Sequence, residues 1–188
     1  KVKLKKTKDV WHEDVRLYEI YDKNNTLRGK FYFDLYARQN KRGGAWMDEC
    51  IQRREKLNGK IQSPVAFITC NSSPPTKKNP AFFTHYDVET LFHEFGHGLQ
   101  HMLTTVNYAG ISGISGVEWD AVELPSQFME NWCWEKDVLD TFAFHFETKK
   151  KLPGNLFKKL LATKNYNTGL ALLRQIEFSL FDFLLHMD

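Results

Sequence analysis

The residues with the clearest chemical meaning form a His-Glu-x-x-His motif at positions 93–97. A helix turns about 100° per residue, so His93 and His97 would project from one face, one turn apart, and both imidazoles could reach one ion. Glu94 would project roughly 100° away from His93, which lets its carboxylate face the open side of that ion without displacing a ligand. The spacing therefore predicts a metal site with a general base beside it.

The donor types favour zinc. Two neutral imidazoles, one carboxylate and an open fourth position are the ligand set of a catalytic zinc site, whereas structural zinc sites are closed and usually rich in cysteine. The ion would polarise a carbonyl group and acidify a water molecule, and Glu94 would take the proton from that water and pass it to the leaving amine. We expect one Zn²⁺ per chain and hydrolysis as the reaction.

A third protein ligand must come from another part of the chain. Four acidic residues that follow a glycine-rich segment could supply it: Glu118, Asp120, Glu123 and Glu130. Glu123 is preferred because it lies between Val122 and Leu124, in an apolar neighbourhood where an unpaired carboxylate is costly and a cation offsets that cost. The alternative that Glu123 lies on a solvated helix face remains open at this point.

Two glycines, Gly96 and Gly98, fall inside the same predicted helix. Each costs roughly 1 kcal/mol of helix stability relative to alanine, which indicates that another backbone or a ligand approaches there. His101 extends the histidine stripe, but it lies roughly 6 Å beyond His97 along the helix axis, too far to share the ion easily. Glu89, one turn before His93, could orient an imidazole or lie on a solvated face.

Local patterns place these residues on secondary structure. Thr84 and Asp87 form a variant of the capping box, which predicts that the motif helix runs over residues 85–104. Earlier extended runs predict a β-hairpin and one further buried strand, and polar periodicity predicts a helix between them. The expected strands are 15–21, 30–36 and 64–70, the polar helix is 47–56, the glycine-rich loop is 109–116, and later helices are 121–134, 155–164 and 168–186. We expect an α+β fold, predominantly helical, with a small N-terminal sheet formed by the hairpin plus one strand.

Composition argues against several other classes. The net charge is +3, and five lysines fall within the first eight residues, so the nearly neutral remainder does not indicate a nucleic-acid-binding surface. No apolar run reaches the 18 or so residues of a membrane span. The three cysteines, Cys50, Cys70 and Cys133, lack paired spacing, which favours a reducing compartment and therefore the cytoplasm. The apolar helix 168–186 could mediate self-association with a second copy.

Three blocks of sequence carry a resemblance to a known family: residues 90–97, residues 110–132, and residues 31–38 with 41–46. With their surroundings, from about residue 11 to residue 186, they resemble the catalytic region of the thimet oligopeptidase family of zinc metallopeptidases. The resemblance implies that His93, His97 and Glu123 bind the zinc ion and that Glu94 is the general base. It also implies a zincin-like helical catalytic region and short, unstructured peptides as substrates.

Members of that family are much longer than this chain. Their downstream glycine-rich segment, with a tyrosine and a histidine that bind substrate and stabilise the oxyanion, is absent from these 188 residues, and the loss of one oxyanion donor typically lowers kcat by about 10²–10³. The first hypothesis is therefore a zinc metalloendopeptidase that cleaves short peptides, and the alternative is a zinc-binding fragment with little or no activity. In both cases we expect a single catalytic-region domain over 1–188, with a strand part at 1–80 and a zinc-binding helical part at 81–188, belonging to a larger peptidase.

Overall fold

The computed structural model describes residues 1–187, in which the chain divides into two compact units. The first unit, Lys1–Glu135, contains the main sheet and the helix that carries the His-Glu-x-x-His motif. The second unit begins at Lys136 and contains further helices. The predicted strand part and the motif helix therefore share one unit. A single catalytic-region domain over all 188 residues remains a prediction.

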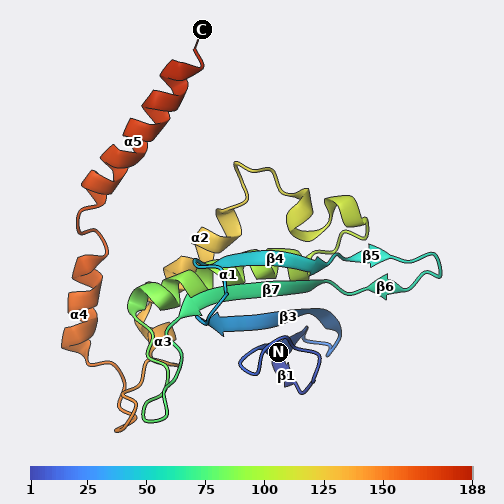
Figure 1. The fold of residues 1–188 in the computed structure, drawn as a ribbon, viewed down its shortest axis with the longest axis horizontal. Helices are drawn as coiled ribbons and strands as arrows, with labels where there is room; N and C mark the ends of the chain where they lie inside the picture. Colours follow the sequence, from blue (N-terminus) through green and yellow to red (C-terminus); the bar gives the residue numbers. More distant parts are fainter. Residues whose placement is uncertain (188) are drawn as a thin grey trace. The chain divides into compact units, whose positions relative to one another are not determined.

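The main sheet has five strands within the described residues, in the order β1-β2-β3-β7-β4 (Figure 1). β2 (Arg16–Tyr21) and β3 (Leu27–Tyr36) are antiparallel and form the predicted hairpin. β7 (Val65–Ser72) is the predicted buried strand and runs parallel to β3. β4 (Trp46–Ile51) pairs with the other side of β7 in antiparallel fashion, so β4 forms one edge of the sheet.

The polar helix predicted over 47–56 is wrong. This segment contains β4 and the short strand β5 (Arg54–Glu55), which pairs with β6 (Ile61–Gln62). β4 is a strand because it pairs along the buried β7, with Met47 opposite Ile68, and such tertiary pairing overrides local preference. The lysine-rich terminus also forms a strand, β1 (Val2–Lys5), paired with β2, so the sheet is larger than a hairpin plus one strand.

The predicted motif helix is confirmed as α1 (His85–Leu103), with the expected capping box. Thr84 Oγ1 accepts a hydrogen bond from the backbone N–H of Asp87 at 3.1 Å, and Asp87 Oδ2 accepts one from the backbone N–H of Thr84 at 2.8 Å. The predicted loop at 109–116 contains two short 3-10 turns, η1 (Ala109–Ile111) and η2 (Gly113–Gly116). The helix predicted over 121–134 is shorter, because regular α-helix covers only α2 (Leu124–Glu130), and a 3-10 turn, η3 (Asn131–Trp134), continues it.

α1 lies across one face of the sheet (Figure 1). The buried core between them consists of Ile20, Phe31, Ala66, Ile68 and Met102. Gly98 allows the close contact, because a Cβ at that position would lie 2.9 Å from Cδ1 of Ile68. The motif helix is therefore fixed against β7 at one of the two glycines that the sequence marked as a point of close approach.

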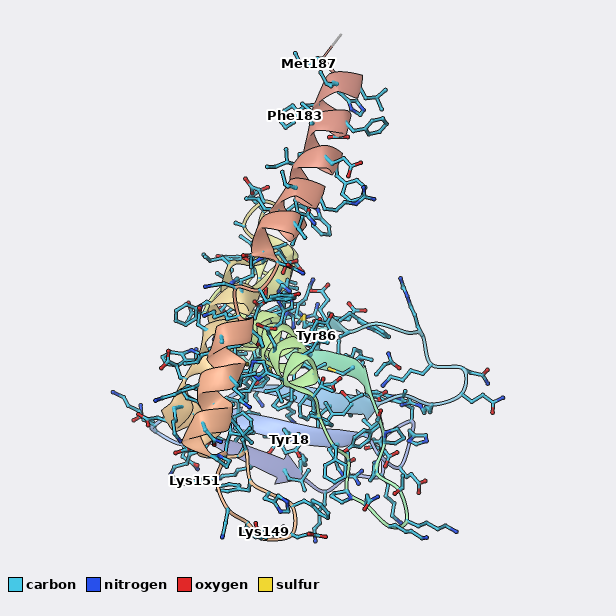
Figure 2. All side chains as sticks on the ribbon, turned by 90° about the vertical axis from the view of Figure 1, so that its left-hand side faces the viewer. Tyr18, Tyr86, Lys149, Lys151, Phe183 and Met187 are labelled. Carbon is cyan, nitrogen blue, oxygen red and sulfur yellow. The ribbon has the colours of Figure 1, made fainter. Side chains whose placement is uncertain are left out.

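The second unit contains α3 (Lys136–Leu139), α4 (Gly154–Thr163) and α5 (Thr168–Leu185), the last two close to the predicted ranges. No residue of α4 or α5 is buried. Phe183 stands off α5 with 69% of its surface exposed (Figure 2). Among residues 1–187, the search for a helix both long and apolar enough to cross a membrane finds none.

Candidate metal centre

The two histidines of the motif meet an acid from α2. Nε2 of His93 and Nε2 of His97 each lie 3.2 Å from Oε2 of Glu123, the N-cap residue of α2. The ligand atoms of the three residues all lie within 4.8 Å of one another. The two imidazole rings are 4.9 Å apart between centroids, with their planes at 84°. The fold thus brings together the set His93, His97 and Glu123.

Two of the separations between these donor atoms match those around a tetrahedral zinc ion. Two ligand atoms that each lie about 2.0–2.1 Å from such an ion are about 3.3 Å apart, and the N–O separations from Glu123 to His93 and to His97 are both 3.2 Å. Two imidazole nitrogens and one carboxylate oxygen leave a fourth position open, as in catalytic zinc sites. The side chain of Glu123 is 51% exposed, so solvent and small molecules can reach this position.

Gly96 sets the distance between the two helices that carry the donors. A Cβ at Gly96 would lie 2.5 Å from the backbone oxygen of Pro125 and 2.6 Å from Cα of Ser126. Only glycine therefore lets α2 contact the backbone of α1 directly. This is the second close approach that the sequence indicated, and it brings Glu123 within reach of both imidazoles.

Two further residues orient these donors: Glu130, which the sequence offered only as a possible third ligand, and Ser126, which it did not single out. Oε1 of Glu130 lies 2.6 Å from Nδ1 of His93; because an ionised carboxylate only accepts hydrogen bonds, the proton of a neutral ring belongs on Nδ1, and the lone pair of Nε2 is free for a metal. The hydroxyl of Ser126 donates to Oε2 of Glu123 at 2.9 Å. One signal was available for Glu130: it follows Glu123 by seven residues, or two helical turns, so the two share a helix face.

Burial shifts the pKa values of Glu94 and His97 at the candidate centre. Glu94 is only 6% exposed, and this burial raises the pKa of its carboxyl group, against the opposing effects of His93 and of a hydrogen bond with the backbone of Met47. Burial also lowers the pKa of His97, whose Nδ1 has no hydrogen-bond partner within the described part of the chain. A neutral imidazole is the form that binds a metal, and a carboxylate with a raised pKa is suited to accepting a proton.

The remaining candidates lie elsewhere. Glu118 and Asp120 are exposed in the segment before α2 and do not belong to the converging set. Glu89 accepts a hydrogen bond from the indole N–H of Trp134 at 3.0 Å, so its carboxylate holds η3 against α1. His101 is completely buried, and its Nε2 lies 3.0 Å from a carbonyl oxygen of β4.

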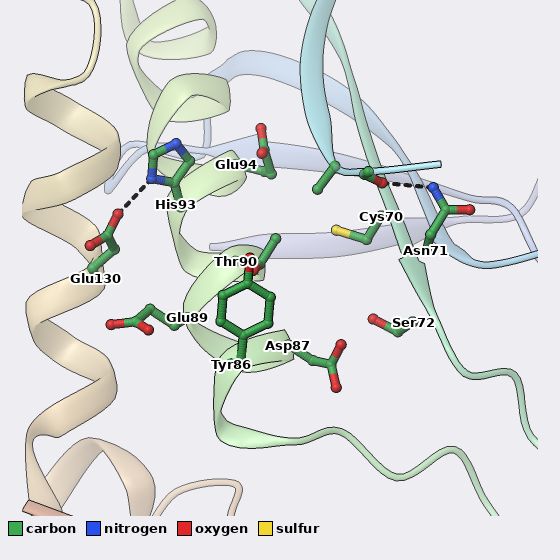
Figure 3. A pocket seen from close by; sticks show the side chains of 12 residues that line it. Cys70, Asn71, Ser72, Tyr86, Asp87, Glu89, Thr90, His93, Glu94 and Glu130 are labelled. Atoms are coloured by element: carbon green, nitrogen blue, oxygen red, sulfur yellow. Dashed lines mark hydrogen bonds and ion pairs between the residues drawn. The ribbon is translucent and has the colours of Figure 1, made fainter. Parts of the chain in front are cut away.

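A cleft of about 580 Å³ opens beside His93 and Glu94. It lies between the first half of α1, the end of β7 and the residues directly before β4. Figure 3 shows Cys70 and Asn71 of β7 on one side of this cleft and His93 and Glu94 of α1 on the other. Burial raises the pKa of the Cys70 thiol to about 12, so this thiol stays protonated at neutral pH. The cleft is large enough to hold part of a peptide next to the candidate centre.

Comparison with known proteins gives consistent matches. The family model described as "Peptidase family M3" matches residues 1–188. The chain is 61% identical over 186 residues to oligopeptidase A of Escherichia coli (strain K12), which covers 99% of this chain and 27% of that relative. It is 48% identical over 181 residues to "Probable cytosolic oligopeptidase A" of Arabidopsis thaliana, a match that covers 94% of this chain and 26% of that relative. It is 35% identical over 184 residues to saccharolysin of Saccharomyces cerevisiae, a match that covers 95% of this chain and 26% of that relative. The chain spans about a quarter of the length of these curated relatives.

Proposed function

This chain belongs to peptidase family M3, and we propose that it forms the zinc-dependent catalytic region of an enzyme that hydrolyses short peptides. In this proposal His93, His97 and Glu123 bind one Zn²⁺, and Glu94 is the general base. The observation that carries it is the convergence of two imidazole nitrogens on one carboxylate oxygen, at 3.2 Å each, next to a buried fourth side chain. The oligopeptidase names of the relatives support short peptides as the substrate class.

A zinc ion bound by these donors would polarise the scissile carbonyl group and lower the pKa of a water molecule there. The chain's own residues supply the proton transfers and the orientation. Glu94 takes a proton from the attacking water and delivers it to the leaving amine. Its raised pKa makes its carboxylate a stronger base for the first of these transfers. Glu130 keeps the ring proton of His93 on Nδ1, and Ser126 holds the carboxylate of Glu123, so the donor atoms are oriented in advance.

The substrate would lie extended in the cleft beside Glu94. β4 is an edge strand, and the backbone groups on its side away from β7 that Glu94 and His101 do not already contact are available to pair with an added peptide strand. Gly44 and Ala45, directly before β4, line the same cleft. An extended main chain satisfies such an edge, whereas a folded protein has already paired its own backbone groups. This supports unstructured peptides as substrates.

The setting of this catalytic region is also part of the proposal. We propose a zincin-like fold, supported by the packing of the motif helix on a sheet whose edge strand borders the cleft. We propose that residues 1–188 act as one catalytic-region domain within a larger peptidase, supported by the quarter-length match to the relatives. A cytoplasmic location is supported by three free thiols, at Cys50, Cys70 and Cys133, and by the name of one cytosolic relative.

Zinc content and peptide cleavage, measured on the same purified chain, test the proposal. The parent should hold one zinc ion and cleave a quenched fluorescent peptide. Glu94→Gln should keep the zinc and abolish cleavage, whereas His97→Ala should lose the zinc. Glu118→Gln is the matched control, because it removes an exposed charge outside the centre, and it should behave like the parent. Loss of zinc in Glu94→Gln would contradict the role of this residue as a base.

The alternative, zinc binding without turnover, is favoured by the quarter-length match, because about three quarters of the length of those relatives lies outside the matched region. Stoichiometric zinc with no detectable cleavage would support this alternative. A parent chain that binds no zinc would refute both forms of the proposal.

A further inference from the structure

We propose that Lys41 and Asn71 are positioning residues that hold residues 42–45 as a fixed wall of the cleft, against which a peptide substrate is aligned. This inference rests on the proposed peptidase function and adds two residues that neither bind the metal nor transfer a proton. The wall borders the cleft through Gly44 and Ala45, while Glu94 and His93 line it from α1.

The centre of the wall has no side chains that could hold it in place. Gly43 and Gly44 have none, and both are exposed. The φ angle of Gly44 is +92°, a backbone conformation that favours glycine. A segment of this kind has high conformational entropy unless groups outside it fix its backbone. Two side chains from outside the wall supply such contacts.

Asn71 bonds to the wall directly. Its Nδ2 donates to the carbonyl oxygen of Arg42 at 2.7 Å and to that of Gly44 at 2.6 Å, and Figure 3 shows the second of these bonds as a dashed line. Asn71 lies at an irregularity of the sheet, where the pairing of β7 with β3 shifts register between Asp34 and Tyr36. Irregularities of this type beside active sites commonly redirect a side chain. Here the redirected amide reaches the wall.

Lys41 fixes the chain immediately before the wall. Its Nζ donates to the carbonyl oxygens of Tyr36 at 2.8 Å and Cys70 at 2.5 Å, and to Oδ1 of Asp34 at 2.8 Å. The side chains of Lys41 and Asp34 are only 5% and 4% exposed. In such a buried environment charge-assisted hydrogen bonds are strong. The ammonium group therefore ties the start of the wall to both β3 and β7.

The elements that hold the wall differ from the elements that carry the proposed zinc ligands. The hydrogen bonds of Lys41 and Asn71 link the wall to β3 and β7, whereas the proposed zinc ligands lie on α1 and at the start of α2. Loosening the wall should therefore weaken peptide binding and leave zinc binding intact. A residue that merely supports the fold would instead lower both together.

The principal variant is Asn71→Ala, which removes both amide bonds to the wall; Lys41→Met is the second. Asn107→Ala is the matched control, because Asn107 accepts a hydrogen bond from Arg53 at 2.9 Å and does not line the cleft. Amide hydrogen exchange over residues 43–46 should become about tenfold faster in Asn71→Ala and stay unchanged in Asn107→Ala, as expected for the loss of one to two hydrogen bonds.

Peptide affinity is measured in the zinc-loaded Glu94→Gln background, by fluorescence anisotropy of a labelled short peptide that this background should bind without cleaving. Adding Asn71→Ala should raise the dissociation constant about tenfold with unchanged zinc content, and adding Asn107→Ala should not.

Unchanged exchange in Asn71→Ala would overturn the proposal whatever the peptide assay gives. Faster exchange with unchanged peptide affinity would overturn the substrate role of the wall, and equal losses of zinc and peptide affinity would do so as well. A parent chain without zinc would refute the proposed function, and hydrogen exchange would still report whether Asn71 fixes the wall.

Discussion

Glu130→Gln should weaken zinc binding without removing any of the three proposed ligands. Oε1 of Glu130 lies 2.6 Å from Nδ1 of His93, where its negative charge fixes the ring tautomer and raises the basicity of Nε2. Glutamine keeps an oxygen acceptor on a side chain of the same length but loses the charge. The remaining neutral hydrogen bond holds the ring more weakly.

Replacement of an orienting group of this kind usually lowers metal affinity by about 10–100-fold. The side chain of Glu130 is 31% exposed, so solvent screens part of its charge. We therefore expect the lower end of the range, about tenfold, which corresponds to about 1.4 kcal/mol of binding free energy.

Competition with a fluorescent zinc chelator at pH 7 measures this effect. Glu118→Gln is the matched control, since Glu118 is exposed and lies outside the centre. An affinity equal to that of the parent would refute the orienting role of Glu130. Complete loss of zinc would identify Glu130 as a ligand and would contradict the choice of Glu123.

Gly96→Ala should lower zinc affinity in the same assay, because its Cβ would meet the backbone of α2, whereas Gly110→Ala, where a Cβ meets nothing within 4 Å, should not. Asp34→Asn should destabilise the fold at pH 7 by about 3 kcal/mol, because it leaves the buried Lys41 without its anion. Burial alone would raise the pKa of Asp34, but hydrogen bonds from its cationic partners hold that pKa well below its usual range. The difference in unfolding free energy between the parent and Asp34→Asn should therefore have its full size above about pH 4 and shrink as the pH falls further. Urea unfolding of both proteins at pH 7 and pH 3 measures this difference. If α5 mediates self-association, light scattering should detect a dimer that Leu173→Glu disrupts, since Leu173 is 62% exposed; a monomeric parent would contradict this.

Local patterns were sufficient for much of the fold. The capping residues Thr84 and Asp87 and the helical spacing that follows them act within one segment, so α1 could be predicted from the sequence. The hairpin of β2 and β3 and the buried strand β7 were predictable for the same reason. β4 was not predictable, because it becomes a strand only by pairing with β7. The residues of β4 alone do not indicate which distant segment they will pair with.

The sequence by itself determined that the two imidazoles share one helix face and that the carboxylate of Glu94 projects away from His93, because a single helix fixes the angles between them. It favoured Glu123 for its apolar neighbours but could not fix which acid joins them, since four acids follow the glycine-rich segment within a short stretch of chain. Only the contact of α2 with Gly96 brought Glu123 to the Nε2 atoms and Glu130 to Nδ1 of His93, across a separation of 37 residues for the latter pair. The position of one helix on another depends on packing between distant segments, and that packing exists only in the folded chain.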